Sequence, residues 1–180
     1  AGKFGGFQES DRIELLKSVE LAGSIQIDGE LQPSEWSEAS EIEMDNMNES
    51  VPRLYGVASP WNGFSDCSAK VKAKWDRDNL YLAFRVTDDK LAQPYRGGHI
   101  TLGDCVEILL SKNQTRHLGE KNLTTDDYWL SFAPIPDREG ACSVSAPSNV
   151  PAAWRKTPAG FNIEAAIPWK CFGDFDLMNE

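Results

Sequence analysis

The first residue that could do chemistry is a glutamate set inside an apolar strand. Glu107 lies in the segment 104–111, where apolar residues predominate. An unpaired carboxylate is costly to bury, so Glu107 must face water, a partner or a ligand. The alternative is an ion pair across a sheet with Arg85 or Lys72. A carboxylate held on a strand can accept hydrogen bonds from the hydroxyl groups of a ligand, provided that other contacts supply most of the affinity.

Aromatic residues away from the most apolar strand faces form a second group of candidates. An aromatic ring packs on the apolar face of a ligand, while polar side chains form hydrogen bonds to its polar groups, each at little net gain in free energy. The candidates for such contacts are Glu107, Trp129, Tyr95, Arg96, Trp154 and Trp61. For the aromatic residues the alternative is partial burial over a loop, and for Arg96 it is a solvated surface charge.

Two pairs of aspartates could contribute to a metal site. Asp76, Asp78, Asp88 and Asp89 offer the carboxylate oxygens that calcium prefers, although their spacing is not that of an EF-hand. The same residues are common turn formers at the ends of hairpins. We expect a structural calcium ion as the one possible cofactor, and no organic cofactor.

Motifs for enzymatic chemistry are absent from the sequence. His99 and His117 both lie in predicted loops, and there is no G-x-S-x-G, H-E-x-x-H or phosphate-binding glycine loop. A carboxylate pair for glycoside hydrolysis stays open, because such pairing depends on the fold. We predict that the domain itself is not an enzyme.

Composition limits the size of the protein and its partners. A chain of 180 residues, 41% of them hydrophobic, supports one domain with one core. The net charge of −10 argues against nucleic acid and anionic membranes as partners. No apolar run is long enough to insert into a membrane, and no signal peptide opens the chain, so we expect that any export signal has been removed. Four cysteines with no metal-binding spacing predict one disulfide or none, with the pairing open.

Alternation of apolar and polar residues predicts the strands that would position these candidates. A hairpin is predicted from 69–75 and 80–86 around the turn at 76–79. A helical turn is expected at 33–39 with Trp36 inward, a short helix from Pro168, and loops at 45–66 and 88–103. The other predicted strands are 24–27, 104–111, 128–133, 142–145, 153–156 and 161–167, and the segment 10–19 fits either a helix or a strand. Together they predict an all-β fold, an antiparallel β-sandwich with short helical turns.

Several ordered motifs resemble those of family 9 carbohydrate-binding modules. They are IDGEL at 27–31 with SEW at 34–36, VKAKWD at 71–76 with NLYL at 79–82, DCVEI at 104–108, and GFNIEAAIPW at 160–169. The resemblance covers about residues 24–172. It implies an immunoglobulin-like or jelly-roll-like sandwich related to the DOMON superfamily, which binds glucose, cellobiose or xylan-type sugars without catalysis and frequently beside calcium.

The same resemblance implies roles for individual residues. Glu107 is similar to a sugar-contacting carboxylate of the family, and Trp129 and Ser131 occupy positions where the family has an arginine and an asparagine. The tryptophans of the structural motifs, Trp36, Trp75 and Trp169, are expected in the core.

The sequence departs from the family in two places. A clamp tryptophan is replaced by Thr101, and the second clamp tryptophan falls beyond the IPW motif, in closing strands that this chain lacks. We therefore expect an N-terminal tail at 1–22 and a module at 23–180 that is truncated before those strands. We predict a secreted or periplasmic location, and attachment to other domains of a parent carbohydrate-active enzyme.

Two other function classes remain open at this point. Some members of the superfamily carry haem, and His99, His117, Met44, Met47 and Met178 could serve as axial ligands. A structural or adhesion domain that binds only protein neighbours is the third possibility.

Overall fold

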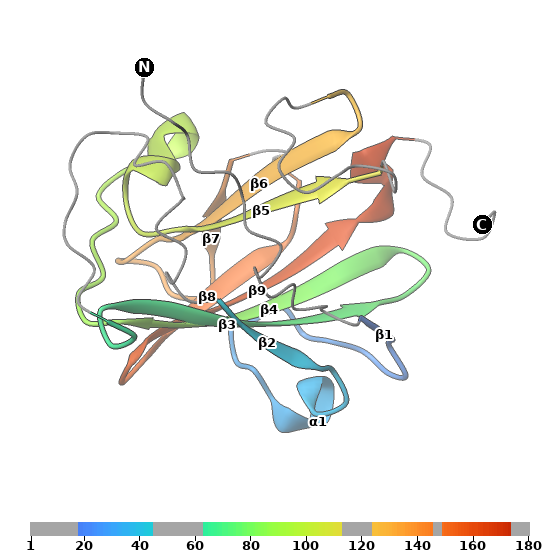
Figure 1. Ribbon diagram of the computed structural model, residues 1–180, viewed down its shortest axis with the longest axis horizontal. Helices are drawn as coiled ribbons and strands as arrows, with labels where there is room; N and C mark the ends of the chain where they lie inside the picture. Colours follow the sequence, from blue (N-terminus) through green and yellow to red (C-terminus); the bar gives the residue numbers. More distant parts are fainter. Residues whose placement is uncertain (1–17, 45–62, 113–123, 146–148, 174–180) are drawn as a thin grey trace, which may run out of the picture.

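Two β-sheets packed face to face make up the protein (Figure 1). The computed structural model describes residues 18–44, 63–112, 124–145 and 149–173. The larger sheet has the order β1-β3-β4-β9-β8, and β2 also pairs with β3. The smaller sheet has the order β5-β6-β7. The predicted all-β antiparallel sandwich is confirmed, with one parallel contact between β1 and β3.

The six-stranded sheet is built around a long hairpin. Its strands are β1 (Val19–Glu20), β2 (Glu41–Met44), β3 (Cys67–Trp75), β4 (Asn79–Asp88), β8 (Ala152–Thr157) and β9 (Gly160–Pro168). The predicted hairpin is therefore confirmed as β3 and β4. The short strand β1 lies inside the segment that we expected to be an N-terminal tail, and it pairs with the end of β3.

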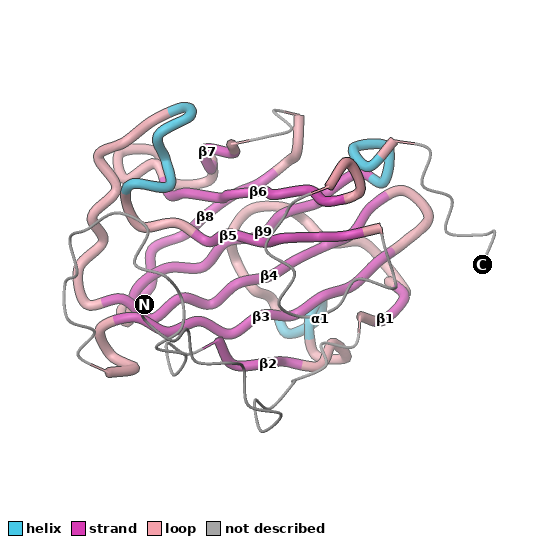
Figure 2. The backbone as a smooth tube through the Cα atoms, turned by 45° about the horizontal axis from the view of Figure 1, so that its top comes forward, coloured by secondary structure: helices cyan, strands magenta, loops and turns pink. Residues whose placement is uncertain are grey.

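The three-stranded sheet consists of β5 (Val106–Ser111), β6 (Asp127–Pro134) and β7 (Cys142–Val144). The strand axes of the two layers are roughly aligned with each other (Figure 2). Alternating residues of each sheet point into the space between the layers, as expected for an aligned sandwich. Phe84, Phe132 and Ile163 are 1%, 0% and 0% exposed in this core. All four cysteines, Cys67, Cys105, Cys142 and Cys171, lie in the described residues, and no disulfide forms between them.

A second apolar cluster covers the outer face of the six-stranded sheet. Trp36 of α1 (Pro33–Trp36) packs there on Tyr81, Ala83 and Ala166, as the sequence predicts for Trp36. Figure 1 shows α1 on the side of this sheet that faces away from the three-stranded sheet. The N-terminal segment thus closes one outer face of the sandwich.

The predicted strand at 24–27 is wrong, because this segment pairs with no strand of the described structure. The turn that follows it is held by Glu164 of β9. Its Oε2 accepts hydrogen bonds from the backbone N–H groups of Asp28 (3.2 Å) and Gly29 (2.9 Å), and its Oε1 accepts from the Trp36 Nε1–H (2.8 Å). The turn at Asp28 and Gly29 therefore gives its backbone donors to a buried carboxylate, and the Gln26 N–H donates to Glu35 Oε1 at 3.0 Å rather than to a neighbouring strand. Ile25 keeps its apolar contact with the second cluster.

In the part of the chain that the structure describes, short helical elements occur at three places. Besides α1, these are the 3-10 helices η1 (Gly97–Leu102) and η2 (Trp169–Phe172). The prediction of a short helix after Pro168 is confirmed. Within the described residues, no helix has the length and apolar character that a membrane-spanning helix requires.

Candidate functional site

The outer face of the three-stranded sheet carries the main candidate residues. In the register of β5 and β6, Glu107 lies opposite Ser131, and Leu109 lies opposite Trp129. The inward neighbours Val106, Ile108 and Leu130 pack in the core. Since side chains alternate along a strand, Glu107, Leu109, Trp129 and Ser131 share the opposite face.

One carboxylate oxygen of Glu107 accepts hydrogen bonds from both Trp129 and Ser131. Glu107 Oε1 accepts a hydrogen bond from the Trp129 Nε1–H at 2.9 Å and another from the Ser131 hydroxyl at 3.2 Å. Ser131 is only 2% exposed, so its buried hydroxyl holds the Glu107 carboxylate from the side of the sheet. No described residue donates a hydrogen bond to Glu107 Oε2. The arrangement presents a positioned carboxylate oxygen beside an indole.

Two large apolar side chains stand exposed on this face. Trp129 is 49% exposed and Leu109 is 48% exposed. Adjacent cross-strand side chains lie close enough to form one contact surface. Leu109 is absent from our predicted contacts, although the alternation along 104–111 places it on the same face as Glu107. Exposed apolar surface next to fixed polar groups is suited to a ligand that is apolar on one side and polar at its edges.

Tyr95 and Arg96 lie in the loop between β4 and β5, just before η1. The helix η1 packs against β6 and β7. Tyr95 is 40% exposed, whereas the Arg96 guanidinium is engaged. It donates to the carbonyl groups of Gln93 and Tyr95 and contacts Asp137 Oδ1 at 3.2 Å. Arg96 therefore acts first as a loop anchor in this structure.

A buried amide holds the same loop in place. Gln93 is 3% exposed, and its Nε2–H groups donate to the carbonyl oxygens of Ile100 and Asp104 at 2.8 Å each. A Cβ atom at Gly103 would lie 2.7 Å from Gln93 Oε1, so only glycine fits there. Thr101 lies exposed in η1.

Two of the predicted aromatic contacts, Trp154 and Trp61, are not found on this face in the described structure. Trp154 is 1% exposed in the core, and its Nε1–H donates to the Arg138 carbonyl at 3.1 Å. Its side chain is thus closed to a ligand, which corrects the expectation of an exposed contact. Trp61 lies outside the described residues.

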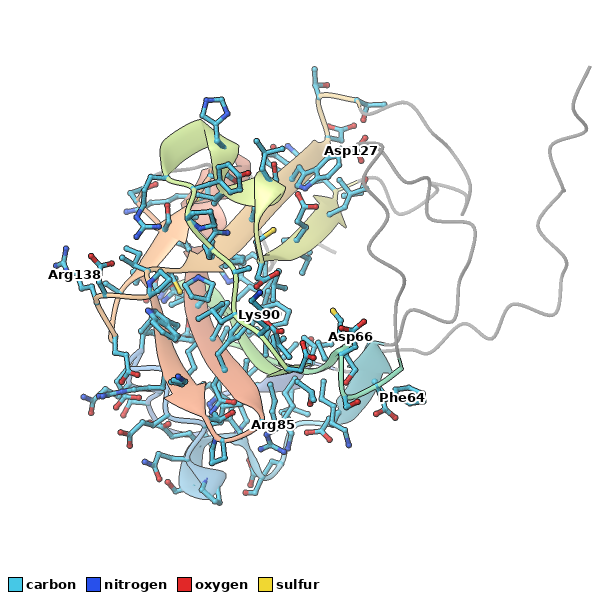
Figure 3. The ribbon with its side chains drawn as sticks, turned by 90° about the vertical axis from the view of Figure 1, so that its left-hand side faces the viewer. Phe64, Asp66, Arg85, Lys90, Asp127 and Arg138 are labelled. Carbon is cyan, nitrogen blue, oxygen red and sulfur yellow. The ribbon has the colours of Figure 1, made fainter. Side chains whose placement is uncertain are left out.

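The alternative ion pair of Glu107 with Arg85 or Lys72 does not form. Both cations belong to the outer face of the six-stranded sheet, on the other side of the molecule. In Figure 3, Arg85 lies toward the lower side, next to the blue N-terminal segment, while Asp127 at the start of β6 lies near the top. The sandwich core separates these two faces.

The four predicted calcium ligands do not gather at one point. Asp76 and Asp78 flank the β3–β4 turn, and Asp88 and Asp89 lie at the opposite end of β4. Among the described residues, no three acidic, histidine or cysteine side chains form a cluster suited to a metal ion. The predicted set therefore does not fit a single calcium site.

Each pair of acids has a local hydrogen-bonding role. Burial favours a higher pKa for Asp76, but hydrogen bonds from the Tyr81 hydroxyl and the N–H groups of Asp78 and Asn79 outweigh it and hold this pKa below its usual range. At the other end of β4, burial and the neighbouring Asp88 carboxylate raise the pKa of Asp104. The first pair is thus a turn former, as the alternative interpretation predicts.

The candidate haem ligands show no convergence in the described part of the chain. His99 is exposed on η1, and Met44 belongs to β2. His117, Met47 and Met178 lie outside the described residues.

Comparisons with known proteins identify a family and a fold. A family model described as carbohydrate family 9 binding domain-like matches residues 27–178. No match is found among curated protein sequences.

Two similar solved structures are those of a carbohydrate binding module family 9 from Caldicellulosiruptor kristjanssonii, in complex with glucose and with cellotriose. Both are 23% identical to this chain and cover 84% of it. The alignments cover 69% and 67% of those chains, with TM-scores of 0.54 and 0.55. At this level of identity the similarity demonstrates a shared fold.

Proposed function

Since the chain belongs to the carbohydrate family 9 binding domain-like family, we propose that it binds carbohydrate, without catalysis, on the outer face of its three-stranded sheet. The observation that carries the proposal is the exposed Trp129 beside the carboxylate of Glu107. The indole supplies a flat apolar surface for the C–H face of a sugar ring. The free Oε2 of Glu107 supplies an acceptor for a sugar hydroxyl at the edge of that surface.

The hydrogen bond between Glu107 and Trp129 prepares both groups for a ligand. It limits rotation of the indole and of the carboxyl group before a sugar arrives. A site that is already ordered loses less conformational entropy on binding, which favours affinity. Leu109 widens the apolar surface on the neighbouring strand.

We propose glucose-type sugars, including cellobiose and xylan-type chains, as the ligand class. The similar structures hold glucose and cellotriose. Thr101 offers no aromatic ring at the clamp position, so we expect one-sided stacking on Trp129 rather than enclosure by two rings. Attachment to further domains of an extracellular or periplasmic carbohydrate-active enzyme belongs to the same proposal, as does a structural calcium ion whose ligands lie beyond the predicted set.

Titration with a glycan panel tests the proposal. Glucose, cellobiose, xylan fragments and manno- and galacto-oligosaccharides would be measured by calorimetry and affinity electrophoresis, with and without calcium. Binding to a glucose-type member is expected, and it should be weakened by Trp129→Ala. If a longer version of the protein binds no member of the panel, the proposal is wrong. Absence of a Soret band in the purified protein would separately exclude haem.

A further inference from the structure

A recess on the opposite side of the molecule has its own chemistry. It lies between α1 and the outer face of the six-stranded sheet, and its volume is about 150 Å³. Leu31 and Pro33 form an apolar wall, while Lys70, Lys72 and Arg85 project from β3 and β4. At about 30 Å³ per water molecule, the space corresponds to roughly five waters.

Positive charge in this recess is only partly balanced. Lys70 contacts Glu41 Oε1 at 3.4 Å, and Glu41 is the single carboxylate that lines the recess. Lys72 donates to the Trp36 carbonyl at 3.2 Å and forms no ion pair within the described residues. Arg85 has no ion pair within the described residues. On β2, Glu41 lies opposite Lys72 and Glu43 lies opposite Lys70, whereas Arg85 has no carboxylate opposite it on either neighbouring strand.

The strand register places the cations unfavourably for stability. Lys70 and Arg85 are direct cross-strand partners, and like charges in that position repel. On the other side of Arg85, the partner on β9 is the neutral Asn162. Glu164 on the same strand is fully buried and accepts three N–H hydrogen bonds, so its carboxylate does not enter the recess. An anion that binds between the cations would relieve this repulsion.

We propose that this recess is a second ligand site, which binds an anionic sugar residue of the hexuronate type. The Arg85 guanidinium would pair with the carboxylate through charge-assisted hydrogen bonds, and Lys72 would add a second donor. The sugar C–H groups would pack on Leu31 and Pro33. The space suits one carboxylate with part of one pyranose ring. This site is independent of the Trp129 face and does not rest on the function proposed for it.

Nuclear magnetic resonance titration with D-glucuronate tests the second site. Amide signals near Leu31, Lys72 and Arg85 should shift, whereas D-glucose should leave them unchanged. Arg85→Gln should weaken glucuronate binding about tenfold, which corresponds to the loss of one charge-assisted hydrogen bond. High salt should also weaken it, because the attraction is electrostatic.

Arg77→Gln is the matched control, since it removes the same charge at the exposed β3–β4 turn, away from the recess. It should leave glucuronate binding unchanged, and so should Trp129→Ala. An unshifted recess at high glucuronate concentration would overturn the proposal. Equal effects of Arg77→Gln and Arg85→Gln, or equal affinity for acetate, would overturn the specific sugar site. Loss of binding at the Trp129 face alone would leave this proposal intact.

Discussion

Two tryptophan–glutamate pairs occupy the two outer faces of the sandwich. Trp36 Nε1–H donates to Glu164 at 2.8 Å, and Trp129 Nε1–H donates to Glu107 at 2.9 Å. The hydrogen bonds are alike, but the N-terminal segment covers the first pair and leaves Glu164 0% exposed, while Trp129 is 49% exposed. The same hydrogen-bonded pair therefore has a structural role where another segment buries it, and it is available for recognition where it stays exposed to solvent.

Burial also changes the acid strength of the covered carboxyl group. Loss of solvent raises the pKa of Glu164 to about 7, against the opposing effect of hydrogen bonds from Trp36, Gly29 and Asp28. The covered pair therefore contains a group that titrates near neutral pH inside the fold. This difference gives ways to test the comparison.

The largest effect is expected from Glu164→Ala. The substitution would leave three N–H donors without their acceptor in a buried place, so the free energy of unfolding should fall by about 3 kcal/mol or more. Urea unfolding followed by tryptophan fluorescence measures it. Glu107→Ala is the control and should cost about 1 kcal/mol or less, as surface substitutions usually do. Similar losses for both variants would contradict the division of roles.

A smaller effect is expected from pH. Between the ordinary glutamate value of 4.5 and about 7, the folded chain holds a proton on Glu164 that the unfolded chain has lost. Stability from this group is therefore complete below pH 4.5 and declines as pH rises toward 7, by up to about 3 kcal/mol. Unfolding curves at a series of pH values for the wild type and Glu164→Gln should differ in slope over this range. Parallel curves would show that Glu164 is ionised throughout.

On the exposed face, Trp129→Ala should affect binding. Loss of the stacking surface should weaken sugar affinity about tenfold, while the thermal transition moves by only a few degrees. Phe64→Ala removes another exposed aromatic ring, 50% exposed at a distant turn, and should leave affinity unchanged. Calorimetry and thermal unfolding on both variants decide the matter. A large drop in stability with Trp129→Ala would mean that its role is packing.

The smallest effect is expected from Glu107→Gln. The side-chain carbonyl can still accept from Trp129 Nε1–H, so the indole stays in place and stability should change by less than about 0.5 kcal/mol. Affinity should fall a few-fold, because the amide is a weaker acceptor for a sugar hydroxyl than the carboxylate. An unchanged affinity would remove Glu107 from direct contact with the ligand.

The sequence predicted the strands of the central hairpin better than the N-terminal segments that pack against the six-stranded sheet. Period-two alternation located the β3–β4 hairpin and placed Glu107 outward, because a strand reveals its two faces locally. The strand expected at 24–27 failed, because alternation does not show whether a partner strand is present; the segment instead leads into a turn held by Glu164, more than a hundred residues away. Strand β2, which lies just before the loop predicted at 45–66, was missed because its pairing with β3 is equally non-local.

The candidate site was predicted in part for the same reason. Alternation and the family resemblance identified Glu107 and Trp129, but neither indicated their mutual hydrogen bond. Trp154 has polar neighbours in sequence and was therefore expected at the surface, although the core of the sandwich closes over it. Whether a tryptophan is covered depends on the opposite sheet, which no local pattern describes.

Strand β3 has a further consequence for how the protein behaves at high concentration. One edge of β3 is shared by two very short strands of opposite direction, β1 at one end and β2 at the other. A long open edge would be a template for pairing with other chains, and short, interrupted edges prevent such growth. The N-terminal strands therefore protect the protein from edge-to-edge aggregation.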